Sequence, residues 1–203
     1  LYNTIDMEYP LFELQISEDE DSTLEVDYVA LVDTPAIEKN FLAFNEQKQH
    51  FAIDNERRII SGAAMIPNFP MFRKGDGEMP DHKVFFSKET IYQIAQKFFM
   101  KGFNRNFNIM HDPEMKMDDV FVFESFISDE ERGIMPMKGF EDTPNGTWFL
   151  SAKVNNDDAW GKVKSGDLKG LSVEGLFKYK KYKMTEEEAF EKIKSILNEI
   201  NEE

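Results

Sequence analysis

Residues 160–177 read WGKVKSGDLKGLSVEGLF, and this stretch decides most of what the sequence predicts about the fold. Just before it, Asn156 is placed to cap a short helix that holds Trp160 and Val163. The tight segment SGDLKG follows, and residues 171–179, LSVEGLFKY, are then predicted to form a single strand. The stretch therefore predicts a helix, a tight turn and a strand in close succession.

The rest of the chain adds more strands than helices. Ser87 and Gly102 bracket the clearest helix, because Ser87 is a good N-cap, the apolar residues between them share one helical face, and glycine ends helices. A capping box beginning at Thr185 predicts a C-terminal amphipathic helix within residues 184–203. Strands are expected over residues 11–16, 24–32, 57–66, 84–86, 107–110, 119–128 and 147–154.

Glycine and proline indicate where these strands are interrupted. Gly62 is typical of a bulge within its strand. Residues 45–56 are polar, and residues 67–82 hold several prolines and glycines, so both segments are predicted to be loops. Together the elements predict an α+β fold with an antiparallel, β-barrel-like core wrapped by a few helices. Residues 1–45 form an N-terminal segment contributing the strand YVALV, residues 46–183 the core, and residues 184–203 the C-terminal helix.

Composition narrows the classes of function. The formal net charge is −15, from 39 acidic and 24 basic residues, and such a surface repels phosphate backbones, which argues against nucleic-acid binding. The absence of cysteine excludes disulfides, thiolate nucleophiles and cysteine-ligated zinc. No apolar run approaches the roughly 20 residues that cross a bilayer. No cofactor-binding or metal-binding motif is present, and the acidic residues after His111 are interpreted as a solvated loop.

The chain has three histidines, and their contexts differ. His50 and His82 occur in polar loop sequence, which is typical of solvated surface histidines. His111 follows the apolar run FNIM and precedes Asp112 and Pro113, so it is expected at a strand end beside a turn. Active-site residues are often placed in this way. The plain alternative for His111 is a hydrogen-bonded histidine at a sheet edge.

Ser172 has the sequence context of a nucleophile. Gly170 and Gly175 flank it, and small residues let a substrate backbone come close. Glu174 lies two residues further on, so it shares a strand face with Ser172. A serine hydroxyl needs an adjacent base, and His111 is the best base in the chain. The plain alternative for Ser172 is a polar position on a strand face.

The order of several short segments resembles the XkdF-type phage serine proteases, a branch of the prohead (capsid-maturation) proteases. The segments that carry this resemblance, besides residues 160–177, are DYVALVDTPAIEKNFLAF, RIISGAAMIPNFPMFR, FFSKETI, NIMHD, VFESFI and NGTWFLSAKV. The wider group is similar to the herpesvirus assembly proteases, whose fold is a closed β-barrel wrapped by helices. The resemblance implies a serine nucleophile and a histidine base that precedes it in sequence, which matches Ser172 and His111.

The third catalytic residue is where this sequence departs from the related proteases. Theirs is a histidine or glutamate at the head of a strand resembling VALV, but that strand precedes the serine here, and the matching position is Tyr28. Glu174 is therefore the candidate, with Glu124 as the alternative. Asp27 is expected to point to the opposite face of its strand. The resemblance also places the oxyanion-binding amides in residues 34–37, where Pro35 has no N–H to donate.

The resemblance implies a serine endopeptidase of capsid maturation that cleaves scaffold and capsid-protein segments, and itself by autoproteolysis. Its partners would be the phage scaffold and major capsid protein, with a homo-oligomer left open and with no nucleic acid, membrane, cofactor or metal. It would act in the interior of the prohead or virion, in the host cytoplasm. Two alternatives remain at this point: a catalytically idle protease-fold component of the capsid, and a soluble binding domain whose histidine and serine are accidental.

Overall fold

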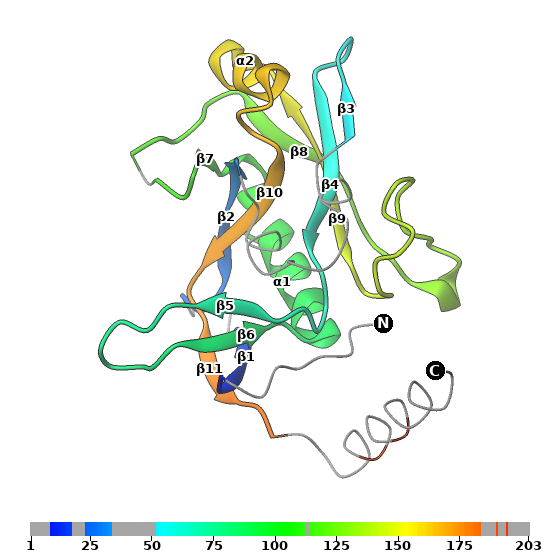
Figure 1. Cartoon of the computed structure of the whole chain (residues 1–203). Coiled ribbons are helices and arrows are strands. Elements are labelled where there is room, and N and C mark those ends of the chain that lie inside the picture. Colours follow the sequence, from blue (N-terminus) through cyan, green and yellow to red (C-terminus); the bar gives the residue numbers. More distant parts are fainter. Residues whose placement is uncertain are drawn as a thin grey trace, which may run out of the picture.

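A computed structural model gives the fold, and it describes residues 9–17, 23–33, 52–112 and 114–183, together with Phe190 and Lys194 (Figure 1). Two α-helices and eleven strands are found in this part of the chain. In chain order they are β1 Leu11–Gln15, β2 Val26–Val32, β3 Ala52–Asp54, β4 Ile59–Met65, β5 Met71–Arg73, β6 His82–Phe85, α1 Lys88–Met100, β7 Phe107–Ile109, β8 Val120–Ile127, β9 Trp148–Val154, α2 Asp157–Ser165, β10 Gly170–Gly175 and β11 Lys178–Lys181.

The described strands form three sheets rather than a closed barrel. Their strand orders are β11-β1-β6-β5, β10-β2-β7 and β3-β4-β9-β8. Two pairs, β1–β6 and β2–β7, are parallel, and the other pairs are antiparallel. The predicted α+β class is confirmed, but the barrel-like core is not. A barrel needs continuous pairing around its circumference, whereas edge strands such as β3, β5 and β7 have only three residues each.

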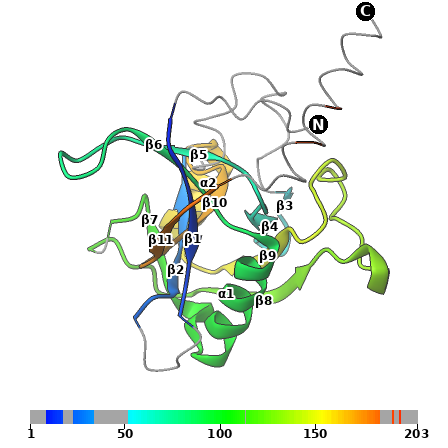
Figure 2. The same cartoon turned by 90° about the horizontal axis from the view of Figure 1, so that it is seen from below.

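Helix α1 lies where the sequence predicted it and packs its apolar face against the core strands. The Oγ of Ser87 accepts from the backbone N of Thr90 at 3.3 Å, which is the expected N-cap. Ile91, Ile94 and Phe98 are at most 1% exposed, so the apolar face is turned inward. Contacts with β2 and β9 follow from this orientation, and α1 lies beside both in the view from below (Figure 2).

The N-terminal strand β2 is central to the middle sheet. Val29 and Leu31 are completely buried. Immediately before the strand, the carboxylate of Glu25 lies 3.4 Å from Nζ of Lys97 on α1 and 2.7 Å from Nζ of Lys101, the residue that caps the C-terminus of α1. This buried ion cluster ties the beginning of β2 to the helix. Because β2 lies between β10 and β7, it joins two segments that are far apart in sequence.

The predicted strand over residues 171–179 is wrong in one respect, because it is two strands in two sheets. The register of β10 against β2 shifts at Gly175, and the N–H of Leu176 then donates to the carbonyl of Glu25 at 3.0 Å. Phe177 turns its ring onto Phe86, at 5.0 Å between centroids. The chain continues as β11, which pairs with β1 in the neighbouring sheet.

Other local predictions differ from the structure in smaller ways. The segments predicted as loops contain the short strands β3 and β5. The pairing of β4 with β9 shifts register between Ala63 and Met65, just after Gly62, where the bulge was expected. Three predictions fall outside the described residues. They concern the C-terminal helix over residues 184–203, of which only Phe190 and Lys194 are described, the segment 34–45 with its expected oxyanion loop, and His50.

Gly175 is required where β10 leaves the middle sheet, because a Cβ there would overlap the carbonyl oxygen of Glu25 and lie 2.8 Å from Cα of Val26. Both are backbone atoms, so they cannot move aside as a flexible side chain could. We expect Gly175→Ala to lower the free energy of unfolding by about 1–3 kcal/mol, measured by urea denaturation. Gly161→Ala in α2 is the matched control, because nothing lies within 4 Å of its Cβ position. Equal stability of the Gly175 variant and the wild type would contradict this account.

Candidate active site

Ser172 and His111 are brought together by the middle sheet. The Oγ of Ser172 lies 3.1 Å from Nε2 of His111, within hydrogen-bonding distance. Ser172 is on β10 and 7% exposed, whereas the His111 side chain is 39% exposed. The two residues are 61 positions apart in the chain. This geometry allows the imidazole to accept the hydroxyl proton.

The turn after β7 aims the imidazole of His111. Met110 and His111 have φ angles of 56° and 59°, so two consecutive residues with side chains adopt the left-handed conformation. Each such residue costs on the order of 1–3 kcal/mol unless its surroundings hold it. Here the N–H of Met110 donates to the carbonyl of Leu31, and the N–H of Asp112 donates to that of Ile109, both at 3.0 Å. Strain of this kind is common at functional sites.

Glu174 faces the other nitrogen of the same imidazole. Its Oε2 lies 3.4 Å from Nδ1 of His111, which is ion-pair distance when the histidine is protonated. The same Oε2 accepts a hydrogen bond of 2.7 Å from Nδ2 of Asn108, a side chain only 1% exposed. A proton on Nδ1 then points toward Glu174, and Nε2 stays free to accept from Ser172.

The strand register explains why these groups meet. Ser172 lies opposite Ala30 across the antiparallel pair β10–β2, and Ala30 lies opposite Asn108 across the parallel pair β2–β7. Residues in one row across a sheet share a face, and Glu174, two residues after Ser172, shares it too. Because Ala30 has a small side chain, it leaves space between Ser172 and Asn108 on this face of the sheet. Asn108 lies three residues before His111 in NIMHD, but nothing in its sequence context indicates this role.

Glu124, the alternative third residue, lies elsewhere. It is an exposed residue of β8 and pairs with Ser151 in a different sheet. Among the contacts described, none joins Glu124 to His111. Tyr28, at the position where the related proteases were expected to carry their third catalytic residue, lies directly opposite Glu174, and the ammonium of Lys116 lies 5.4 Å from the centroid of its ring.

Asp27 also contributes charge near Glu174. Burial is the main reason why the pKa of the Asp27 carboxyl is raised, and the nearby charge of Glu174 raises that pKa further. Lys116 partly offsets this effect. Asp27 therefore interacts electrostatically with the site, but the residue in ion-pair distance of His111 is Glu174.

His82 is not the solvated loop histidine that its sequence context suggested. It begins β6, is 5% exposed, and its Nδ1 lies 2.8 Å from the carbonyl oxygen of Pro80. Its ring packs edge-on against Phe12 and Tyr179. The alternation of buried His82 and Val84 along one strand face is the signal that could have indicated this burial.

A cavity of about 530 Å³, here called the Ser172 cavity, opens beside the three residues. Ser172, His111 and Glu174 all line it, at one part of its wall. Most other lining residues are apolar, among them Ala64 and Met65 of β4, Phe69 before β5, Phe86 after β6, Leu171 of β10 and Phe177 after β10. A peptide segment with apolar side chains can therefore lie next to the hydroxyl of Ser172.

In the part of the chain that the structure describes, no three histidine or acidic side chains come together in a way that could hold a metal ion. The described helices also include none that is long and apolar enough to span a membrane.

Comparison with protein families adds an independent finding. The family model described as "Putative phage serine protease XkdF" matches residues 48–181, which include His111, Ser172 and Glu174. The chain belongs to this family. The description of this family indicates a phage serine protease, and the site contains the serine and histidine that such an enzyme needs. The match shows no link to the herpesvirus assembly proteases, and no curated protein and no solved structure matches the chain.

Proposed function

We propose that this XkdF-family chain is a serine endopeptidase of phage capsid maturation, with Ser172 as nucleophile, His111 as general base and Glu174 as the residue that orients His111. The observation that carries the proposal is the continuous contact from Ser172 Oγ to His111 Nε2, at 3.1 Å, and from His111 Nδ1 to Glu174 Oε2, at 3.4 Å. A nucleophile, a base and an orienting carboxylate in this order are what acyl transfer requires.

The first half of the reaction follows from this geometry. The Oγ of Ser172 attacks the carbonyl carbon of a peptide bond while Nε2 of His111 takes the hydroxyl proton. The imidazolium that forms faces the carboxylate of Glu174, whose position is fixed by Asn108. Nε2 then gives the proton to the leaving amine, the C–N bond breaks, and the acyl group stays on Ser172 as an ester.

Water completes the second half. His111 takes a proton from a water molecule, which attacks the ester carbonyl, and returns that proton to the Ser172 oxygen as it leaves. The product acid and the free serine are then restored. The resemblance to related proteases implies that the amides which stabilise the oxyanion belong to residues 34–37, which lie outside the described part of the chain.

The proposed substrates are segments of the phage scaffold and major capsid protein, cleaved in the interior of the immature shell, together with the protease itself by autoproteolysis. The phage origin of the family supports this setting, and the apolar Ser172 cavity supports a peptide as the ligand. The second candidate, a catalytically idle capsid component, would not need two consecutive left-handed residues to hold His111 on Ser172.

The test is incubation of the purified chain with the scaffold and major capsid proteins of its own phage, followed by mass spectrometry of the intact proteins and fragments. Internal cleavages made by the wild type and missing with Ser172→Ala would support the proposal. If both partner proteins stay intact with the wild-type chain, the idle-component alternative is favoured instead. Cleavage that persists in the Ser172→Ala sample would point to another protease.

A further inference from the structure

Among the described residues, no ion pair joins Arg73 to a carboxylate, and of the two arginines for which this is so, only Arg73 lines the Ser172 cavity. Its Nη1 donates to the carbonyl oxygen of Phe72 at 3.1 Å. Arg105 lies over an aromatic ring, 5.9 Å from the centroid of Phe121. The remaining three arginines each form an ion pair with an aspartate: Arg57, Arg58 and Arg132. In a chain with 39 acidic and 24 basic residues, a cation left without a carboxylate is unexpected.

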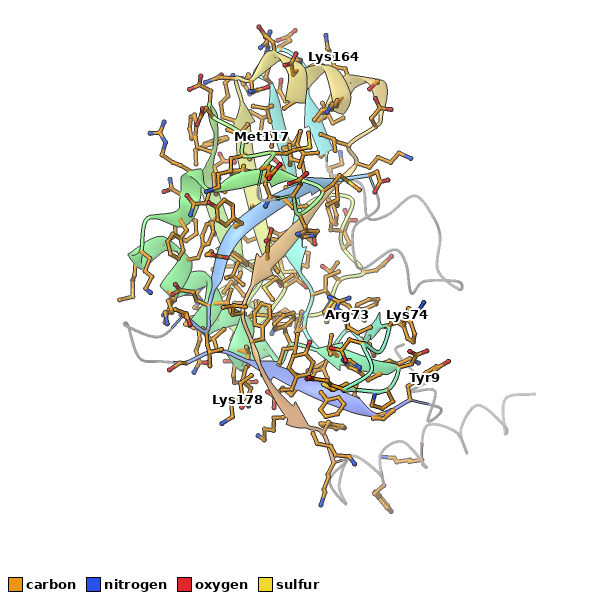
Figure 3. The ribbon with its side chains drawn as sticks, turned by 90° about the vertical axis from the view of Figure 1, so that its left-hand side faces the viewer. Tyr9, Arg73, Lys74, Met117, Lys164 and Lys178 are labelled. Atoms are coloured by element: carbon orange, nitrogen blue, oxygen red, sulfur yellow. The ribbon has the colours of Figure 1, made fainter. Side chains whose placement is uncertain are left out.

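Arg73 lines the Ser172 cavity at the end of β5. The two preceding residues of β5, Met71 and Phe72, line the cavity as well. Figure 3 shows Arg73 beside Lys74 at this end of the molecule. Burial lowers the pKa of the Arg73 guanidinium, because the charged form loses water, and Tyr179 partly offsets this effect. The guanidinium nevertheless stays charged, and its planar fork suits a carboxylate.

The charges around the cavity are arranged in two separate groups. The acidic residues Glu174 and Asp33 line it on the side of the middle sheet, where Ser172 is located. Arg73 belongs to the other sheet, β11-β1-β6-β5, at its β5 edge. Apolar side chains make up most of the wall. A ligand that suits this cavity therefore has apolar groups and one carboxylate, and that carboxylate lies away from Glu174.

We propose that Arg73 binds the carboxylate of an aspartate or glutamate side chain in the peptide that Ser172 cleaves, so that the enzyme selects peptides with an acidic residue at a fixed distance from the scissile bond. This inference rests on the proposed function, because it assigns substrate selection to the same cavity. Bidentate hydrogen bonding of a carboxylate by a half-buried arginine is stronger than a neutral hydrogen bond and is geometrically specific. The same chemistry could come from the terminal carboxylate of a peptide.

The experiment has two stages, and the first uses a tryptic digest of a bacterial lysate as a peptide library. Wild-type protein is incubated with it, and mass spectrometry identifies the new termini. Aspartate and glutamate are expected to be enriched at one position relative to the cleaved bond. Cleavage with no acidic preference would overturn this inference while leaving the proposed function intact. No cleavage of the library or of the phage proteins would overturn both.

The second stage uses a synthetic peptide with an amidated C-terminus and its counterpart with glutamine in place of the selected acidic residue. We expect glutamine to reduce kcat/KM by about ten- to one-hundred-fold, mainly through KM, since one charge-assisted interaction is lost. A free C-terminus that restores full activity to the glutamine peptide would show that a terminal carboxylate is the true ligand.

Variants assign the preference to Arg73. Arg73→Gln should remove the difference between the two peptides, and Arg73→Glu should invert it in favour of lysine at that position. Lys74→Ala is the matched control, because it removes a neighbouring positive charge that does not line the cavity. Thermal unfolding checks that each variant is folded. If the other Arg73 variants do not fold, Arg73→Lys takes their place, because it keeps the positive charge but lacks the planar fork. An unchanged glutamate preference in Arg73→Gln would overturn the proposal.

Discussion

Alanine at Ser172, at His111, or at both positions together is expected to reduce kcat/KM for a scaffold-derived peptide by a similar factor, roughly 10⁴-fold or more. The reason is that the two side chains act as one unit: Nε2 of His111 lies 3.1 Å from Oγ of Ser172 and has a function only if that hydroxyl is present. Removing either one leaves the other idle. Single-turnover measurements on the three variants and the wild type would test this.

A buried serine outside the site provides the control for this comparison. Ser151 is 4% exposed, and its Oγ lies 2.8 Å from Oγ of Ser61, but it does not line the Ser172 cavity. Ser151→Ala removes a comparable buried hydroxyl and should leave kcat/KM within about threefold of the wild type. If the Ser172/His111 double variant were far slower than either single variant, the two residues would contribute independently and the pair would not be a catalytic unit.

The parts of the site that sequence could predict are those fixed by local periodicity. Ser172 and Glu174 are two residues apart in a strand, so a shared face follows from the pleat alone. His111 was expected at a strand end, and it lies two residues after the end of β7, in the turn that follows. Its approach to Ser172 depends on β2 pairing with both β10 and β7. Residue patterns do not encode such long-range pairings, so the sequence could pair the two residues only because His111 is the best base in the chain and because the family resemblance implies the same pair.

What the sequence missed depends on three-dimensional packing. Asn108 is an unremarkable asparagine until the register places it in one row with Ser172. Arg73 ends the segment RIISGAAMIPNFPMFR, and its place at the wall of the Ser172 cavity depends on where the fold puts β5. The burial of His82 was missed because its neighbours in sequence are polar.

The prediction of a barrel-like core was wrong for a related reason. Strand existence is a local property, and most strands of the core were predicted near their observed bounds. Closure of a barrel instead requires each edge strand to find a partner. At Gly175 the chain leaves β2 and passes to β1 as β11, so one predicted strand is divided between two sheets.

Glu174→Gln is expected to reduce kcat by up to roughly 10⁴-fold while Ser172 and His111 are both retained. The amide of glutamine can donate to Nδ1 of His111, which favours the tautomer with its proton on Nε2, and that nitrogen then cannot accept from Ser172. The amide also carries no charge to stabilise the imidazolium. The matched control is Glu124→Gln, an exposed carboxylate on β8, which should stay within about twofold of the wild type.

The readout that separates orientation from folding is kcat against KM, measured with thermal unfolding of each variant. Loss of an orienting carboxylate lowers kcat and leaves KM nearly unchanged, because the interaction with His111 strengthens only as the imidazolium forms. A general structural defect would instead lower the melting temperature and the fraction of active protein. Near-normal kcat in both glutamine variants would mean that the site works as a Ser172–His111 dyad. In that case the hydrogen bond from Asn108 to Glu174 would have a structural role, since the carboxylate it positions would not be needed for turnover.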